Sequence, residues 1–318
     1  MGWKGILTGV ALLAATGATV TGCAAYREAQ AEEDNPPIGR ILDVDGHPVH
    51  AWVKGSGPDV VLIHGSSGNL RDFTHSFAGR LTDRYRVIAF DRPGLGYTPE
   101  MAPGGDSMKA QAALLQKAAA QLGANRPIVV GQSLGGAVAL AWATYTPDTL
   151  AALVTISGVS HPWTTPLSTY YKVLSNPVGQ HTVVPLMTAF VPESTIEASI
   201  KSIFDPFPVP DGYADYVGAR LTLRRASLRA NADQRARLLS DVKTQSQLYG
   251  SAITVPVEVV HGTEDSTVGP ELHVPQMERD VPQTRVTLIA GAGHMPHHTH
   301  PDPVVAAIDS AAARAGLR

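Results

Sequence analysis

Short apolar runs of strand length recur along this chain, with stretches of helical character between them. The clearest runs are at residues 59–63, 87–90, 128–130, 153–156, 257–260 and 286–289. Apolar residues on consecutive positions indicate strands that are buried on both faces, as in a parallel sheet covered by helices. The Ala- and Leu-rich stretches 107–122 and 134–146 have no internal proline and predict crossover helices. The pattern therefore predicts an α/β fold.

Two segments depart from this alternation. Residues 41–54 alternate between apolar and polar around Asp45-Gly46, which predicts a leading antiparallel hairpin. Between about residues 160 and 245 prolines and aromatic residues become frequent, and only 219–248 has clear helical character. We expect this segment to be a cap inserted after the sixth strand. It would lie over the carboxyl edge of the sheet, where open α/β sheets bind ligands.

The N-terminus has the order of a secretory leader. Lys4 precedes an uncharged, mostly apolar stretch from Gly5 to Cys23, just long enough to span a membrane. Its end, Val20-Thr21-Gly22-Cys23, resembles the bacterial lipobox, in which the cysteine receives diacylglycerol. A lipoprotein attached through Cys23, an uncleaved helical anchor and a cleaved signal peptide all remain open. Each places the folded domain outside the cytoplasm, the first two on a membrane.

Residues 24–37 are polar and acidic and end in Pro36-Pro37, which predicts a flexible tether between residues 1–23 and a domain over 38–318. The net charge of the chain is −3, and no run of Lys and Arg forms a phosphate-binding surface. We therefore expect no nucleic-acid partner. Because Cys23 is the only cysteine, the chain cannot form an internal disulfide.

The strongest single motif is Gly131-Gln132-Ser133-Leu134-Gly135, between an apolar run and a helical stretch. This is the G-x-S-x-G nucleophile elbow in the strand–turn–helix context that the motif requires. Glycines are needed because a strand that turns directly into a helix crowds the residues two before and two after the serine. The sequence predicts Ser133 as a nucleophile.

A serine hydroxyl needs a neighbouring base, and that base needs a carboxylate to fix its tautomer. His294 follows the run 286–289 in a Gly-rich turn, and Asp265 follows the run 257–260. Both therefore reach the sheet edge from which the elbow emerges. Glu264 competes with Asp265 for the role of the acid, but adjacent loop residues point differently, and we favour Asp265.

An ester-cleaving site also needs backbone N–H donors for an oxyanion. The residue after the nucleophile, Leu134, is one candidate donor, and Ser66 in the loop 64–69 is the other. The alternative interpretation of this loop is an ordinary turn, since Gly and Ser suit any turn.

Histidines 297, 298 and 300 crowd behind His294 and raise the alternative of a metal site. No cysteine or carboxylate pair accompanies this tract, so we expect no metal and no cofactor.

Together these motifs resemble the α/β-hydrolase fold-1 family over residues 38–318. The motifs that carry the resemblance are His64-Gly65, the segment 91–97 (DRPGLGY), the elbow, the segment 261–265 (HGTED) and Gly293-His294. The resemblance implies a mostly parallel eight-stranded sheet with helices on both faces, and the Ser, Asp, His order of its triad. Epoxide hydrolases and dehalogenases of this family use Asp at the elbow, so Ser133 argues against both activities.

The motifs leave the substrate open, because one fold hosts many reactions. Our first hypothesis is hydrolysis of small to medium apolar carboxylic esters through an acyl-enzyme. The second is cleavage of a C–C bond in a β-diketone-like substrate. The third is a binding module on the same fold, which the presence of all three triad residues disfavours.

Overall fold

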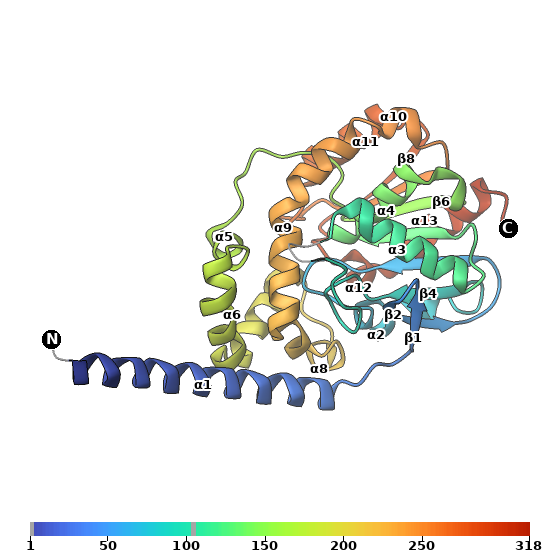
Figure 1. The fold of residues 1–318 in the computed structure, drawn as a ribbon. Coiled ribbons are helices and arrows are strands. Elements are labelled where there is room, and N and C mark those ends of the chain that lie inside the picture. Colours follow the sequence, from blue (N-terminus) through green and yellow to red (C-terminus); the bar gives the residue numbers. More distant parts are fainter. Residues whose placement is uncertain (1–2, 103–105) are drawn as a thin grey trace.

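The computed structural model describes residues 3–102 and 106–318, and its centre is a single eight-stranded sheet (Figure 1). The sheet order is β1-β2-β4-β3-β5-β6-β7-β8. β2 pairs antiparallel with both of its neighbours, and all other neighbouring strands are parallel. The strands are β1 (Arg40–Val44), β2 (His47–Lys54), β3 (Asp59–Ile63), β4 (Arg86–Phe90), β5 (Ile128–Gln132), β6 (Ala152–Ile156), β7 (Val257–Gly262) and β8 (Thr284–Ile289).

This sheet confirms the predicted fold class, and each of the apolar runs forms a strand. The expected hairpin is β1–β2, and its turn residues Asp45 and Gly46 both have positive φ, 54° and 83°. Two residues with positive φ match the type I′ turn that suits a two-residue hairpin. Both helices expected beside the elbow are present, as α3 (Met108–Gln121) and α4 (Leu134–Tyr145).

Helices cover both faces of the sheet and enclose two apolar cores. One core joins the sheet to α3, α4 and α11 (Pro270–Asp280), with Leu115 and Trp142 among its buried side chains. The other joins it to α2 (Arg71–Ser76) and α13 (Pro301–Arg314), through residues such as Phe73 and Ile308. Both faces of the central strands are therefore buried, which explains why their sequences are apolar on consecutive positions.

The cap lies between β6 and β7, as predicted, but more of it is helical than the sequence indicates. The sequence analysis did not predict α6, because proline usually interrupts a helix. Pro177, however, occupies the first turn of α6, where proline is tolerated, and Asn176 caps the helix by accepting the Val178 N–H at 2.9 Å. The cap elements are α5 (Thr169–Leu174), α6 (Pro177–Phe190), α7 (Glu193–Phe204), α8 (Tyr213–Tyr216), η3 (Ala219–Leu223) and α9 (Arg225–Ser246). Shorter elements elsewhere are η1 (Ala78–Arg80), η2 (Pro147–Thr149), α10 (Tyr249–Ala252) and α12 (Pro296–Thr299).

The N-terminal segment differs from the flexible tether that the sequence predicts over residues 24–37. One helix, α1, runs from Trp3 to Asp34 and packs against α6 and η3 of the cap. Figure 1 shows α1 passing below the cap, with its N-terminal half extending beyond the rest of the molecule. Three of the four acidic residues that suggested a solvated spacer instead contact arginines of the cap.

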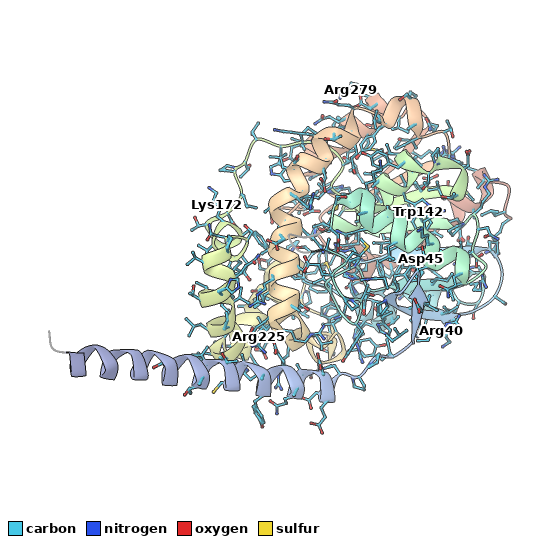
Figure 2. All side chains as sticks on the ribbon, viewed as in Figure 1. Arg40, Asp45, Trp142, Lys172, Arg225 and Arg279 are labelled. Carbon is cyan, nitrogen blue, oxygen red and sulfur yellow. The ribbon has the colours of Figure 1, made fainter. Side chains whose placement is uncertain are left out.

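Three acidic residues of α1 pair with arginines at the start of α9 and in η3. Glu28 receives both a side-chain Nη2 bond of 2.6 Å and a backbone N–H bond of 2.7 Å from Arg225, which Figure 2 labels where α9 meets α1. The other two pairs are Glu32 with Arg224 at 2.9 Å and Asp34 with Arg220 at 3.3 Å. Paired charges on one helix face hold the C-terminal half of α1 against the cap.

Cys23 lies within α1 and is partly exposed. The predicted leader, residues 1–23, lies partly outside the residues whose side chains the structure describes. Within the described part of the chain, no helix is long and apolar enough to cross a membrane.

Glu28→Gln should loosen the docking of α1. Burial raises the pKa of Glu28, but its hydrogen bonds with Arg225 outweigh burial and hold that pKa below its usual range. Because the folded-state pKa is lowered, the stabilisation is present at neutral pH and is lost as the pH falls through the folded pKa. We expect protease cleavage within residues 24–37 to become several-fold faster in this variant. Glu33→Gln, at an exposed position of the same helix, is the matched control, and equal cleavage of both variants would contradict the pairing.

Candidate active site

Ser133 stands at the junction between β5 and α4 with a strained backbone, φ 54° and ψ −121°. Glycine makes this junction possible, because a Cβ on Gly131 would lie 2.2 Å from the Gly135 carbonyl oxygen. A Cβ on Gly135 would lie 2.2 Å from the Ile63 carbonyl oxygen. A residue held in such a conformation costs about 1–3 kcal/mol, and such residues cluster at functional sites.

The structure brings Ser133, His294 and Asp265 together at the carboxyl edge of the sheet. His294 Nε2 is 3.0 Å from Ser133 Oγ, and His294 Nδ1 is 2.8 Å from Asp265 Oδ2. Because a carboxylate only accepts hydrogen bonds, Nδ1 donates its proton to Asp265. Nε2 is then free to accept the hydroxyl proton of Ser133, as a general base must.

Asp265 is buried and accepts several hydrogen bonds. The backbone N–H groups of Thr267 and Val268 each donate to Oδ1 at 2.9 Å. His261 Nε2, which donates to the Val268 carbonyl at 2.7 Å, also lies 3.2 Å from Asp265 Oδ2. Burial raises the pKa of Asp265, but the hydrogen bonds from His261 and His294 outweigh it and lower that pKa far below its usual range. The carboxyl is therefore a permanent anion beside His294.

Glu264, the competing candidate for the acid, is exposed and lies outside this hydrogen-bonded arrangement. Its side chain is in solvent, while its backbone N–H donates to the Ala292 carbonyl at 2.9 Å. The structure therefore places Asp265, and not Glu264, against His294.

The two residues predicted as oxyanion donors flank the nucleophile. Leu134 is the first residue of α4, so its N–H has no partner within that helix. Gly65 lies close to the serine, since a Cβ built on it would be 3.1 Å from Ser133 Cβ. Ser66 follows Gly65 directly, and its hydroxyl donates to Asn231 Oδ1 at 2.8 Å. The donor role of Ser66 and Leu134 stays a prediction.

A buried arginine braces the loop that carries Ser66. Arg92 donates to the carbonyl oxygens of His64 and Gly65, at 2.9 and 2.8 Å, and to Gln234 of the cap at 2.7 Å. Burial lowers the pKa of His64 to about 4. The neutral ring can therefore donate from Nδ1 to the Gly65 carbonyl and accept the Arg92 N–H at Nε2, 3.0 Å away. Loop and cap are thus held in one network.

Several contacts of the site were missed by sequence reasoning. The Gln132 side chain donates from Nε2 to the backbone carbonyl oxygen of His294 at 3.3 Å. Asn231, which accepts the Ser66 hydroxyl, also accepts the Ser67 N–H at 2.9 Å. Gln132 and His261 lie inside recognised motifs and could have been considered. Asn231 carries no local signal, because only the folded cap brings it to the loop.

The remaining histidines of the tract do not gather around His294. His297 and His298 contact Asp72, and His300 Nδ1 lies 3.0 Å from Thr299 Oγ1. Asp72 lies more than 200 positions away, and the sequence analysis did not include it.

Known structures share this fold at low sequence identity. An esterase from Thermogutta terrifontis superposes with a TM-score of 0.71 and 23% identity, covering 87% of this chain and 99% of that one. A membrane phospholipase A described as a bacterial virulence factor superposes with a TM-score of 0.64 and 21% identity, covering 97% and 99%. Because the latter match covers 97% of this chain, it extends into the 32-residue helix α1.

Among curated sequences, haloalkane dehalogenase 2 of Mycobacterium tuberculosis is 24% identical over 293 residues, covering 86% of this chain and 94% of the dehalogenase. Residues 58–301 match the family described as the alpha/beta hydrolase fold, and this range spans most of the chain, including every residue of the candidate site. The chain therefore belongs to the α/β hydrolase fold family.

Proposed function

We propose that this hydrolase cleaves carboxylic esters with small to medium apolar groups, through an acyl-enzyme on Ser133. The observation that carries the proposal is the unbroken relay of hydrogen bonds from Ser133 Oγ through His294 to Asp265. A relay of this kind makes an otherwise weak hydroxyl nucleophile reactive at neutral pH.

The reaction follows from the position of each group. Ser133 Oγ attacks the ester carbonyl while His294 Nε2 takes its proton, and the resulting oxyanion is stabilised by the N–H groups of Leu134 and Ser66. His294 then returns the proton to the leaving alcohol, which leaves an acyl group on Ser133. Water, deprotonated by His294, releases the acid and restores the serine. Asp265 remains ionised throughout and stabilises the imidazolium.

Three observations support ester hydrolysis over the other activities that this family includes. A dehalogenase of this fold uses a carboxylate nucleophile, whereas this elbow presents Ser133. A binding module would not need to keep Ser133, His294 and Asp265 in hydrogen-bonding order. The Thermogutta terrifontis protein with the same fold is itself described as an esterase. Cleavage of a C–C bond by the same relay is the second candidate activity, and substrate tests must distinguish it from ester hydrolysis.

The surroundings of His294 favour an apolar substrate. Met295, directly after it, packs in a buried cluster with Phe204, Tyr213 and Val217 of the cap. Ser133 is 7% exposed and His294 is 5% exposed, so a substrate reaches them beneath the cap. Apolar walls with a few converging polar groups are typical of sites for small organic ligands.

We also propose that the enzyme is extracytoplasmic and membrane-anchored. The support is the uncharged stretch from Gly5 to Cys23, with the lone cysteine at its end. The structural match that reaches into α1 is a protein described as a membrane phospholipase. The anchor is either a lipid on Cys23 or the uncleaved N-terminal segment, whose first fifteen side chains lie outside the described part of the structure.

A panel of p-nitrophenyl esters of increasing chain length tests the function. Short- to medium-chain esters should be hydrolysed at full rate in EDTA, because the relay needs no metal. Ser133→Ala should abolish turnover while the protein remains folded. Inactivity on every ester, combined with cleavage of a β-diketone, would replace the proposal with C–C hydrolysis.

Asp265→Asn should preserve the fold and lower kcat by roughly 10⁴-fold, because His294 loses the anion that fixes its tautomer. Glu264→Gln is the matched control and should have little effect, since its side chain is exposed. Steady-state kinetics of both variants decide the assignment, and a larger loss in Glu264→Gln would reverse it.

The intact mass of membrane-extracted protein distinguishes the two anchors. A lipoprotein should lack residues 1–22 and carry added lipid on Cys23, because two or three acyl chains are needed for firm anchoring. Cys23→Ser should then stop processing. A membrane-bound product that begins at Met1 and carries no lipid would exclude lipidation and leave the helical anchor.

A further inference from the structure

The turn that follows His294 meets an acidic side chain from a distant part of the chain. His297 and His298 lie in α12, and Asp72 lies in the first turn of α2. His297 Nε2 is 3.1 Å from Asp72 Oδ2, and His298 Nε2 is 2.9 Å from Asp72 Oδ1. One carboxylate therefore faces two imidazole nitrogens, one at each of its oxygens.

These three side chains are almost completely buried. Both imidazoles are fully buried, and the Asp72 side chain is 7% exposed. Aromatic rings surround the histidines, with Phe73 against His297 at a centroid distance of 5.2 Å and Phe204 against His298 at 5.5 Å. Such an apolar shell excludes water and strengthens any electrostatic interaction inside it.

The buried charge of Asp72 lacks a permanent cation. Among the described residues, no lysine or arginine forms an ion pair with Asp72. A buried carboxylate is costly unless it is paired with a cation or coordinates a metal ion.

We propose that Asp72, His297 and His298 form a binding site for one divalent transition-metal ion, such as Zn²⁺. Imidazole nitrogens and carboxylate oxygens are ligands that such ions prefer. The three ligand atoms lie within 4.8 Å of one another. Ligands about 2.0–2.2 Å from a shared tetrahedral ion would be separated by about 3.3–3.6 Å. The two histidine–carboxylate contacts, at 3.1 and 2.9 Å, lie near this spacing.

The site joins three separate parts of the molecule. Tyr213 of α8 donates its hydroxyl proton to Asp72 Oδ1 at 2.6 Å, so the cap meets the ligand carboxylate directly. α12 begins two residues after His294. A bound ion would therefore fix the cap and the catalytic turn to α2. The ion would have a structural role, because the relay of Ser133, His294 and Asp265 does not involve it. The inference does not depend on which substrate the enzyme cleaves.

Metal titration of EDTA-treated protein tests the site. Calorimetry with Zn²⁺ should give about one equivalent bound, and Co²⁺ should produce visible absorption typical of low-coordinate sites. Zn²⁺ in large excess over Kd should raise Tm by several degrees, because a ligand that binds only the folded state stabilises it. Absence of binding by both ions at micromolar to millimolar concentrations would overturn the proposal.

Variants locate the bound ion. His298→Gln and Asp72→Asn should each weaken Zn²⁺ binding by at least about tenfold and remove the Tm increase. If Asp72→Asn does not fold, because the amide can accept hydrogen bonds at only one of its two terminal atoms, His298→Gln alone decides. His300→Gln and Cys23→Ser are matched controls that should leave binding unchanged. Binding that survives in folded His298→Gln, or that is lost in either control, would place the ion elsewhere and contradict the site.

Discussion

The backbone of Ser133 is the constraint on which the rest of the site depends. Its positive φ turns β5 directly into α4, so Ser133 stands at the carboxyl edge of the sheet, directly before the first turn of α4. The turn exists only because Gly131 and Gly135 allow backbone atoms to approach where a Cβ would collide. Strand, turn and helix therefore fix the position of Ser133, and the stability of the two buried cores offsets a strain of about 1–3 kcal/mol.

The same sheet edge explains how residues far apart in sequence meet. β5, β7 and β8 are parallel, so the loops after them that carry Ser133, Asp265 and His294 emerge side by side. The cap closes over this edge and is tied to it by polar contacts at Asn231 and Gln234. One cap helix, α9, carries both contacts and therefore ties the cap to the loops that follow β3 and β4.

The sequence predicted what depends on local pattern and failed where tertiary contacts decide. The buried strands, the elbow and the order of the motifs depend on short segments of sequence, and the structure has each of them where the sequence predicts it. The helix over residues 24–34 was missed because its acidic side chains suggested a solvated spacer, and their arginine partners lie almost 200 positions away. Asp72 and Asn231 were missed for the same reason, since their partners are assembled only by folding.

The central claim is that Ser133 is the nucleophile, and covalent labelling measures it most directly. A fluorophosphonate reacts with a serine only when a neighbouring base has activated it. Peptide mass mapping after labelling should find the adduct on the peptide containing Ser133, and Ser133→Ala should remain unlabelled. An adduct on another residue, or labelling that persists in Ser133→Ala, would contradict the account.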